Sequence, residues 1–263
     1  MMESRLAYLG RWIVFLFAIK YPVRFLFVRV GPKEVREKPD IAAFHIVHIV
    51  PILALCYFAL AGRADWIWEQ PLTLDGRMYA ADPSGAAERI CLIQIALQIF
   101  VLATALATRE PTLLKPELLV HHLVTGAVMV QCLRPLSDGG GLFATSRIAI
   151  FFGLTELSTV PLTIVDAFKS FKDLRARRQG LDFGAKVTFM LLFLIIRVGI
   201  VTPHSVYFQK DIFEVLATGK AHSRATLAFF AGANCFLVGL QLYWAYLILG
   251  RAYKTLVQGD KSD

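Results

Sequence analysis

Apolar runs long enough to cross a lipid bilayer recur along the chain. Six of them predict membrane-spanning helices, at about residues 41–61, 90–108, 118–133, 142–168, 184–203 and 225–250. A helix needs roughly 20 predominantly apolar residues to cross the hydrocarbon core. Hydrophobic residues make up 56% of the sequence, above the usual share in a soluble domain. The pattern therefore predicts an all-α, polytopic membrane protein.

The N-terminal segment is apolar as well, but basic residues interrupt it. Arg11, Lys20, Arg24 and Arg29 divide residues 5–30, so that the longest uninterrupted stretch has only eight residues. Two interpretations stay open: an additional N-terminal helix lying in the membrane interface, or a poorly hydrophobic span whose basic side chains reach the headgroups. We accordingly divide the chain into a basic hydrophobic helix with its connector (1–39), a transmembrane domain (40–250) and a short polar tail (251–263).

Charge sets the expected orientation. With six core spans, one membrane face carries 18 Lys and Arg residues, in 1–40, 109–117, 167–183 and 251–263, and the other carries 7. The positive-inside rule places the first face, with the start of the core domain and the C-terminus, in the cytoplasm. The net charge of +8 is thus explained by membrane topology, and we predict membrane lipids rather than nucleic acid as partners. All four cysteines lie in apolar runs, which indicates core residues rather than disulfides.

Four histidines fall near the cytoplasmic ends of two predicted spans. His45 and His48 are spaced i, i+3 and share a helix face. The adjacent His121 and His122 point about 100° apart, so we expect one to face a cavity and the other to bond a neighbouring helix. Histidine can act as a general base or accept an acyl group, and we predict His121 and His122 as catalytic residues. The open alternative is that these histidines only hydrogen-bond between helices.

Further polar residues lie deeper in the predicted spans. Glu156 and Arg197 are expected nearer mid-membrane, where an unpaired charge is costly, so each should pair with the other or with another polar group. The predicted substrate-binding residues are His45, His48, Glu156, Ser158, Thr159, Arg197, Asn234 and Trp244.

Cofactor chemistry finds little support in the sequence. Six histidines, two of them on the opposite face, are too few for a membrane di-iron site, and we predict no metal. A zinc site made by His45, His48, His121 and His122 stays an open alternative. The basic loop 169–178 would attract the phosphates of acyl-CoA as a co-substrate, although topology determination and headgroup contact also explain it.

Several segments together resemble the TLC-domain superfamily, which includes ceramide synthases and translocon-associated membrane proteins. They are HHLVTGAVM, FFGLTELSTVPLTIVDAFK and FLIIRVGI, with Asn234 and Trp244 in the last span, and the resemblance covers roughly residues 40–250. It implies a six-helix barrel around a lipid-sized cavity open to the cytoplasm, in the endoplasmic reticulum. In ceramide synthases the paired histidines, which match His121 and His122, serve acyl transfer.

The chain departs from the synthase pattern. The H-D-x-x-D run of the synthases is replaced by T-E-L-S-T-V-P, and there is no homeobox-like insert. The sequence is therefore closer to the non-synthase TLC-domain proteins. It predicts a protein of lipid metabolism or homeostasis that binds an acyl chain or acyl-CoA, and leaves open whether it is an acyl-CoA-dependent acyltransferase. The alternative is a non-catalytic lipid sensor, carrier or cargo adaptor, acting with membrane-protein partners or as a homo-oligomer.

Overall fold

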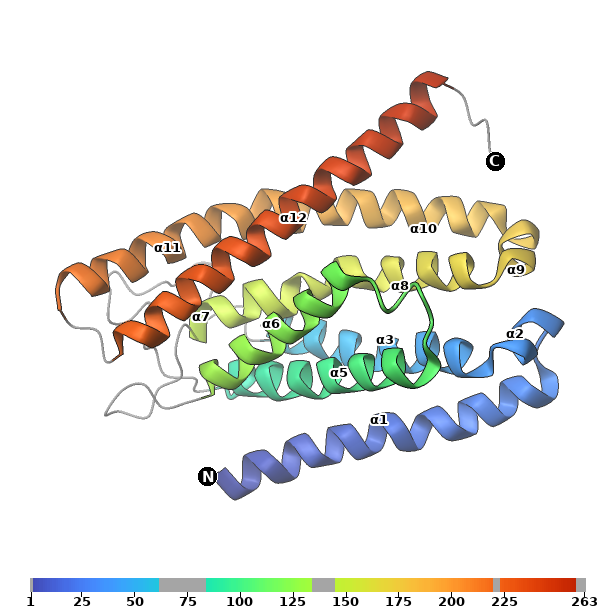
Figure 1. Cartoon of the computed structure of the whole chain (residues 1–263), viewed down its shortest axis with the longest axis horizontal. Coiled ribbons are helices and arrows are strands. Elements are labelled where there is room, and N and C mark those ends of the chain that lie inside the picture. The colour runs from blue at the N-terminus through green and yellow to red at the C-terminus, as the bar shows by residue number, and fades with distance from the viewer. Residues whose placement is uncertain (1, 62–83, 134–144, 220–222, 259–263) are drawn as a thin grey trace. The chain divides into compact units, whose positions relative to one another are not determined.

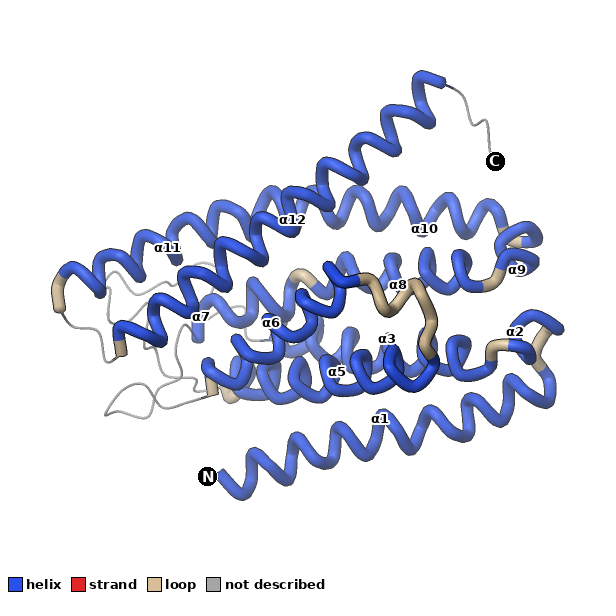
Figure 2. Tube along the Cα trace, viewed as in Figure 1, coloured by secondary structure: helices blue, strands red, loops and turns tan. Residues whose placement is uncertain are grey.

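The computed structural model describes residues 2–61, 84–133, 145–219 and 223–258, and within these ranges it contains helices and short connections but no strand (Figures 1 and 2). The predicted all-α class is confirmed. The helices are α1 (Met2–Val30), α2 (Lys33–Glu37), α3 (Pro39–Ala61), α5 (Ala86–Thr108), α6 (Pro116–Cys132), α7 (Thr145–Ile148), the π-helical η2 (Ala149–Leu154), α8 (Glu156–Ser170), α9 (Lys172–Arg177), α10 (Gln179–Leu192), the π-helical η3 (Phe193–Val201), α11 (Thr202–Ala217) and α12 (Arg224–Gln258).

Five helical segments are long and apolar enough to cross a membrane, which makes the chain an integral, multi-pass membrane protein. They are Pro39–Ala61, Ala86–Thr108, Ala149–Ser170, Gln179–Ala217 and Arg224–Lys254. The remaining predicted span corresponds to α6, whose 17 residues are the least that can cross the hydrocarbon core.

One predicted boundary is wrong. We expected the fifth span to end near Pro203 and a loop to follow, but the helix continues through α11 to Ala217. The reason is an amphipathic pattern that mean hydropathy misses. Phe208, Ile212 and Val215 follow one another at intervals of four and three residues, and all three are buried.

The described chain forms two compact units. Unit 1 comprises Met1–Phe189 and unit 2 comprises Met190–Asp263. In unit 1, α3 packs against α1, α5, η2 and α8, and α6 packs against α5; in unit 2, η3 and α11 pack against α12. The six-helix barrel implied by the resemblance would need helices of both units, and it stays a prediction.

The N-terminal segment is one helix of 29 residues that packs against α3 and α5 (Figure 1). At about 1.5 Å per residue it is roughly 43 Å long, more than the thickness of the hydrocarbon core. Near its start, Arg5 lies 2.7 Å from the carboxylate of Glu88 and donates a hydrogen bond to the carbonyl oxygen of Leu133.

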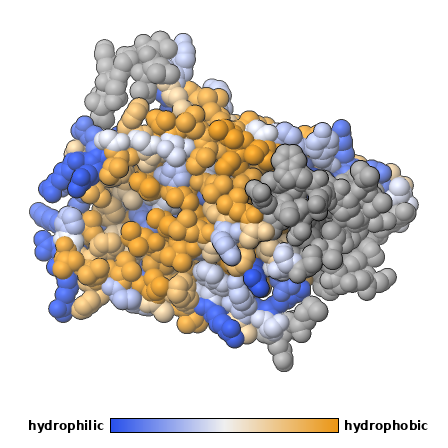
Figure 3. Space-filling model, turned by 180° about the vertical axis from the view of Figure 1, so that it is seen from behind, coloured by the Kyte–Doolittle hydropathy of each residue, from blue (hydrophilic) through white to orange (hydrophobic). Residues whose placement is uncertain are grey.

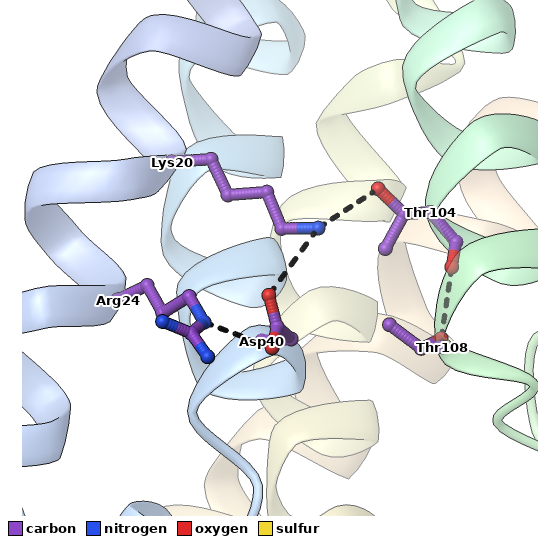
Figure 4. Close-up of polar contacts among 5 residues, drawn as sticks. All are labelled: Lys20, Arg24, Asp40, Thr104 and Thr108. Atoms are coloured by element: carbon purple, nitrogen blue, oxygen red, sulfur yellow. Dashed lines mark hydrogen bonds and ion pairs between the residues drawn. The ribbon is translucent and has the colours of Figure 1, made fainter.

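Further along α1, Lys20 and Arg24 reach toward Asp40 at the start of α3, and Lys20 also reaches Thr104 near the end of α5 (Figure 4). The nitrogen of Lys20 lies 3.4 Å from the hydroxyl of Thr104. Arg5 contacts the beginning of α5 and Lys20 contacts the region near its end. The helix α1 therefore runs along most of the length of α5. The helix α1 is not among the five segments that are long and apolar enough to cross a membrane, and the choice between a span and an interfacial helix stays open.

The core of unit 1 lies where α3, α5 and η2 meet. The helices approach closely at Gly153, where an added Cβ would lie 2.5 Å from the Cβ of Ala59. Apolar side chains also cover much of the outer surface, such as Leu53, Tyr57 and Leu123, and Figure 3 shows a largely apolar face. Such exposure suits contact with lipid rather than water.

All four cysteines are free, as predicted, and three of them are buried. Cys235 differs from the expected core position, because its side chain is exposed. A surface turned toward lipid can be as apolar as a core, so an apolar run does not tell the two apart.

Candidate functional site

Four polar side chains from three helices form a continuous row of hydrogen bonds in unit 1. Nδ1 of His122 on α6 lies 2.6 Å from Oε1 of Gln98 on α5. The amide nitrogen of Gln98 donates to Oε1 of Gln94 over 2.7 Å, and the amide nitrogen of Gln94 donates to Oε1 of Glu156 over 2.8 Å. We call Gln94 and Gln98 the amide bridge, since they connect the imidazole to the carboxylate.

The local sequence explains why the amide bridge forms. Gln94 and Gln98 are four residues apart and therefore lie on one face of α5, and both are buried. Gly126 lies opposite Gln98, where an added Cβ would lie 3.8 Å from the Gln98 side chain, at ordinary van der Waals distance. The third helix is irregular at this point. The π-helical η2 departs from the α-helical hydrogen-bond ladder, and its Phe152 carbonyl oxygen accepts a second bond from Gln94 over 3.0 Å.

The adjacent histidines diverge as predicted. Their ring centroids are 5.4 Å apart, and the ring planes meet at 63°. Both side chains are half-buried. His122 bonds the neighbouring helix α5, which confirms one half of the expectation. A cavity facing His121 stays a prediction.

His45 and His48 share a helix face, as their spacing predicted, and this face meets α8. Nε2 of His45 lies 3.4 Å from the hydroxyl of Ser170, and Nδ1 of His48 lies 3.4 Å from the hydroxyl of Thr163. The His48 ring also stacks on Phe44. The two histidines of α3 thus contact two hydroxyl groups of α8.

Glu156 lies deeper than the histidines, as expected from its position in the chain. Gln94 is fourteen residues from the end of α5, and its partner Glu156 is fourteen residues from the end of α8, about 21 Å along each helix. His122 is only six residues from the start of α6, about 9 Å. The row of hydrogen bonds therefore runs from one end of the bundle toward its middle.

The other two predicted residues of α8 bond within their own helix. The hydroxyl of the fully buried Ser158 donates to the carbonyl oxygen of Thr155 over 2.8 Å. The carbonyl oxygen of Thr159 accepts a bond from the hydroxyl of Thr163, the residue that contacts His48. These contacts are structural, and substrate binding by Ser158 or Thr159 stays a prediction.

The remaining predicted residues belong to unit 2. Arg197 is buried in η3, where its guanidinium donates to Oε1 of Gln241 over 3.2 Å and lies over the Phe193 ring. Asn234 on α12 donates to the carbonyl oxygen of Ser205, while Trp244 is half-buried on the same helix. The expectation that Glu156 and Arg197 each have a polar partner is confirmed, with glutamine as the partner in both cases.

The sequence analysis did not single out Gln94 or Gln98. A signal was present, because two amides four residues apart stand in an otherwise apolar span, and a buried amide requires partners. In the described ranges no three His, Cys, Asp or Glu side chains are grouped so that they could hold a metal ion. The zinc alternative therefore has no geometric support in those ranges. His122 bonds an amide, and His45 and His48 bond hydroxyl groups.

Comparison with known proteins adds one result. A family model described as the TLC domain matches residues 38–250, a range that contains the amide bridge and the histidines His45, His48, His121 and His122. No curated protein sequence and no solved structure matches the chain.

Proposed function

The chain belongs to the TLC-domain family, and we propose that it is a membrane protein of lipid metabolism or homeostasis that binds an acyl chain or acyl-CoA between its helices. The observation that carries this proposal is the position of His122. Its imidazole is held by a buried amide among membrane-spanning helices. Polar side chains at such depth are costly and mark functional sites by default.

In the enzymatic form of the proposal, His122 is the general base, with His121 as the alternative. An amine or hydroxyl attacks the thioester carbonyl of acyl-CoA while the imidazole accepts its proton. The carbon–sulfur bond then breaks, and the thiolate of CoA leaves and takes up that proton. The new amide or ester and free CoA are the products, and no oxidant or metal is needed.

A non-catalytic function is the second candidate, and one observation favours it. His45, His48 and His122 each hydrogen-bond a neighbouring helix. Interhelical bonds of this kind can serve assembly alone. The protein would then be a lipid sensor, a carrier or a cargo adaptor, working with membrane-protein partners or as a homo-oligomer.

The proposal extends to location. The excess of basic residues on one face supports a cytoplasmic position for the start of the core domain and for the C-terminus. Acyl-CoA would approach from that side, where the basic segment that includes α9 favours its phosphates. The endoplasmic reticulum is proposed from the family resemblance.

Native mass spectrometry with lipid extraction tests the proposal. The full chain is compared with His121→Ala/His122→Ala and with the control His204→Ala, which changes a histidine of α11. We expect wild type and control to retain an acyl lipid or acyl-CoA that the double variant loses. If all three carry the same annular lipids and nothing else, the ligand-binding proposal is wrong.

Acyl transfer is then measured in proteoliposomes with long-chain acyl-CoA and a panel of lipid amines and alcohols. Release of CoA by wild type and the control, and its loss in the double variant, would support the enzymatic form. A retained ligand without CoA release would favour the sensor or carrier.

A further inference from the structure

We infer that the amide bridge sets the tautomer of His122, so that Nδ1 carries the hydrogen and Nε2 carries the lone pair. Gln98 and Gln94 are then positioning residues, and Nε2 is the atom that accepts a proton. The inference rests on the proposed function only for the use of that lone pair. The tautomer itself follows from the hydrogen bonds of unit 1.

The carbonyl oxygen of Phe152 determines which groups donate and which accept along the row of hydrogen bonds. A backbone carbonyl oxygen can only accept, so the group of Gln94 that lies 3.0 Å from it must be the amide nitrogen. The same nitrogen faces the carboxylate of Glu156, which also accepts when it is ionised. Because the Phe152 bond alone suffices, the orientation of Gln94 does not depend on the charge of Glu156.

This orientation passes along the bridge. Because the amide nitrogen of Gln94 faces Phe152, its amide oxygen faces Gln98. The amide nitrogen of Gln98 must therefore donate the hydrogen bond to that oxygen, over 2.7 Å. The opposite orientation of Gln98 would bring two carbonyl oxygens face to face. Gln98 therefore presents its oxygen to His122, and Nδ1 at 2.6 Å must donate.

The arrangement follows the logic of a catalytic triad, in which a third group holds the base in the correct tautomer. A carboxylate usually takes that place. Here two neutral amides stand between the imidazole and Glu156, so they orient the ring without placing a negative charge beside it. An amide does not readily pass protons along, and we assign the bridge to orientation rather than to proton transfer.

Nitrogen NMR on histidine-labelled protein in lipid bilayers tests the inference directly. The spectrum separates protonated from unprotonated ring nitrogens, and His122→Gln identifies the signals of this residue. Measurement at about pH 8 keeps an ordinary imidazole neutral. We expect wild-type His122 to show a single tautomer with the hydrogen on Nδ1.

The decisive variant is Gln94→Leu, since its side chain is not the one that bonds His122. Without Gln94, the Gln98 amide can turn over, and signals of both His122 tautomers should appear. The matched control Gln131→Leu removes a glutamine from α6 itself and should leave the single tautomer unchanged. In Gln98→Leu, signals of both His122 tautomers should appear as well.

Two results would overturn the inference: a hydrogen on Nε2 in wild type, or an unchanged single tautomer in Gln94→Leu. Preserved signals of the other histidines show whether each variant is folded. The readout needs no substrate. If both His122 tautomers appear in the Gln94→Leu variant but the wild-type protein retains no acyl ligand, the proposed function is wrong and the role assigned to the amide bridge still holds.

Discussion

Arg5, at the beginning of α1, forms an ion pair of 2.7 Å with Glu88, at the beginning of α5. The same guanidinium donates to the carbonyl oxygen of Leu133, just beyond the end of α6. One basic side chain thus connects three helices at one end of unit 1. Of the basic residues that interrupt the N-terminal segment, Lys20 and Arg24 also contact neighbouring helices, through Thr104 and Asp40.

The course of α1 predicts the topology of the N-terminus. Because α1 runs along α5, its two ends should lie on opposite sides of the membrane. A glycosylation acceptor fused before residue 2 is compared with one inserted in the connector 31–38. We expect only the N-terminal acceptor to be modified. Modification of both or of neither, with an acceptor inserted in residues 134–141 on the predicted non-cytoplasmic face as the modified reference, would show that α1 does not cross.

The Arg5–Glu88 pair should contribute measurably to stability. The pair is partly buried, so its loss should cost more than that of an exposed pair and less than that of a fully buried one. We expect Arg5→Ala to lower the free energy of unfolding by about 1–2 kcal/mol. Lys169→Ala breaks the exposed pair with Asp166 and should cost less than about 0.5 kcal/mol. Equal effects of both variants in thermal unfolding would contradict the assigned role.

The close approach at Gly153 predicts a size-dependent substitution. A methyl group there would meet Ala59, and we expect Gly153→Ala to destabilise the protein by about 1–3 kcal/mol through overpacking. Exchanging the two residues, in Ala59→Gly/Gly153→Ala, should recover much of the loss. Gly184→Ala, which meets nothing within 4 Å, is the control and should be neutral or slightly stabilising. A tolerated Gly153→Ala would show that α3 and η2 can separate.

The Arg197–Gln241 contact supports unit 2. Removing the acceptor in Gln241→Leu takes a hydrogen bond from a buried guanidinium, and should cost about 1.5–3 kcal/mol. Gln241→Glu keeps an acceptor at the same position and should retain most of the stability. Thermal unfolding in detergent compares the two variants. A Glu variant as unstable as the Leu variant would indicate that packing, rather than the hydrogen bond, matters here.

Periodicity and hydropathy were sufficient to predict the helical class and the positions of most apolar helices. They were also sufficient to place the histidines near one end of the bundle and Glu156 deeper. The physical reason is that the hydrocarbon core of a membrane permits few backbone conformations. Every backbone polar group must be satisfied within its own segment, so each long apolar run becomes a helix and depth follows from residue number.

Only the tertiary structure decided which side chains pair with one another in hydrogen bonds and ion pairs. No local pattern tells which side chain of α5 meets His122, and the amide bridge exists only because α5, α6 and η2 are packed side by side. The N-terminal helix shows the same limit, because its basic residues lower its hydropathy and the partners of Arg5 and Lys20 lie on other helices. Hydrogen bonds and ion pairs between helices depend on which side of each helix faces its neighbour. The rotation of a helix about its axis is set by packing, and not by the composition of any one apolar segment.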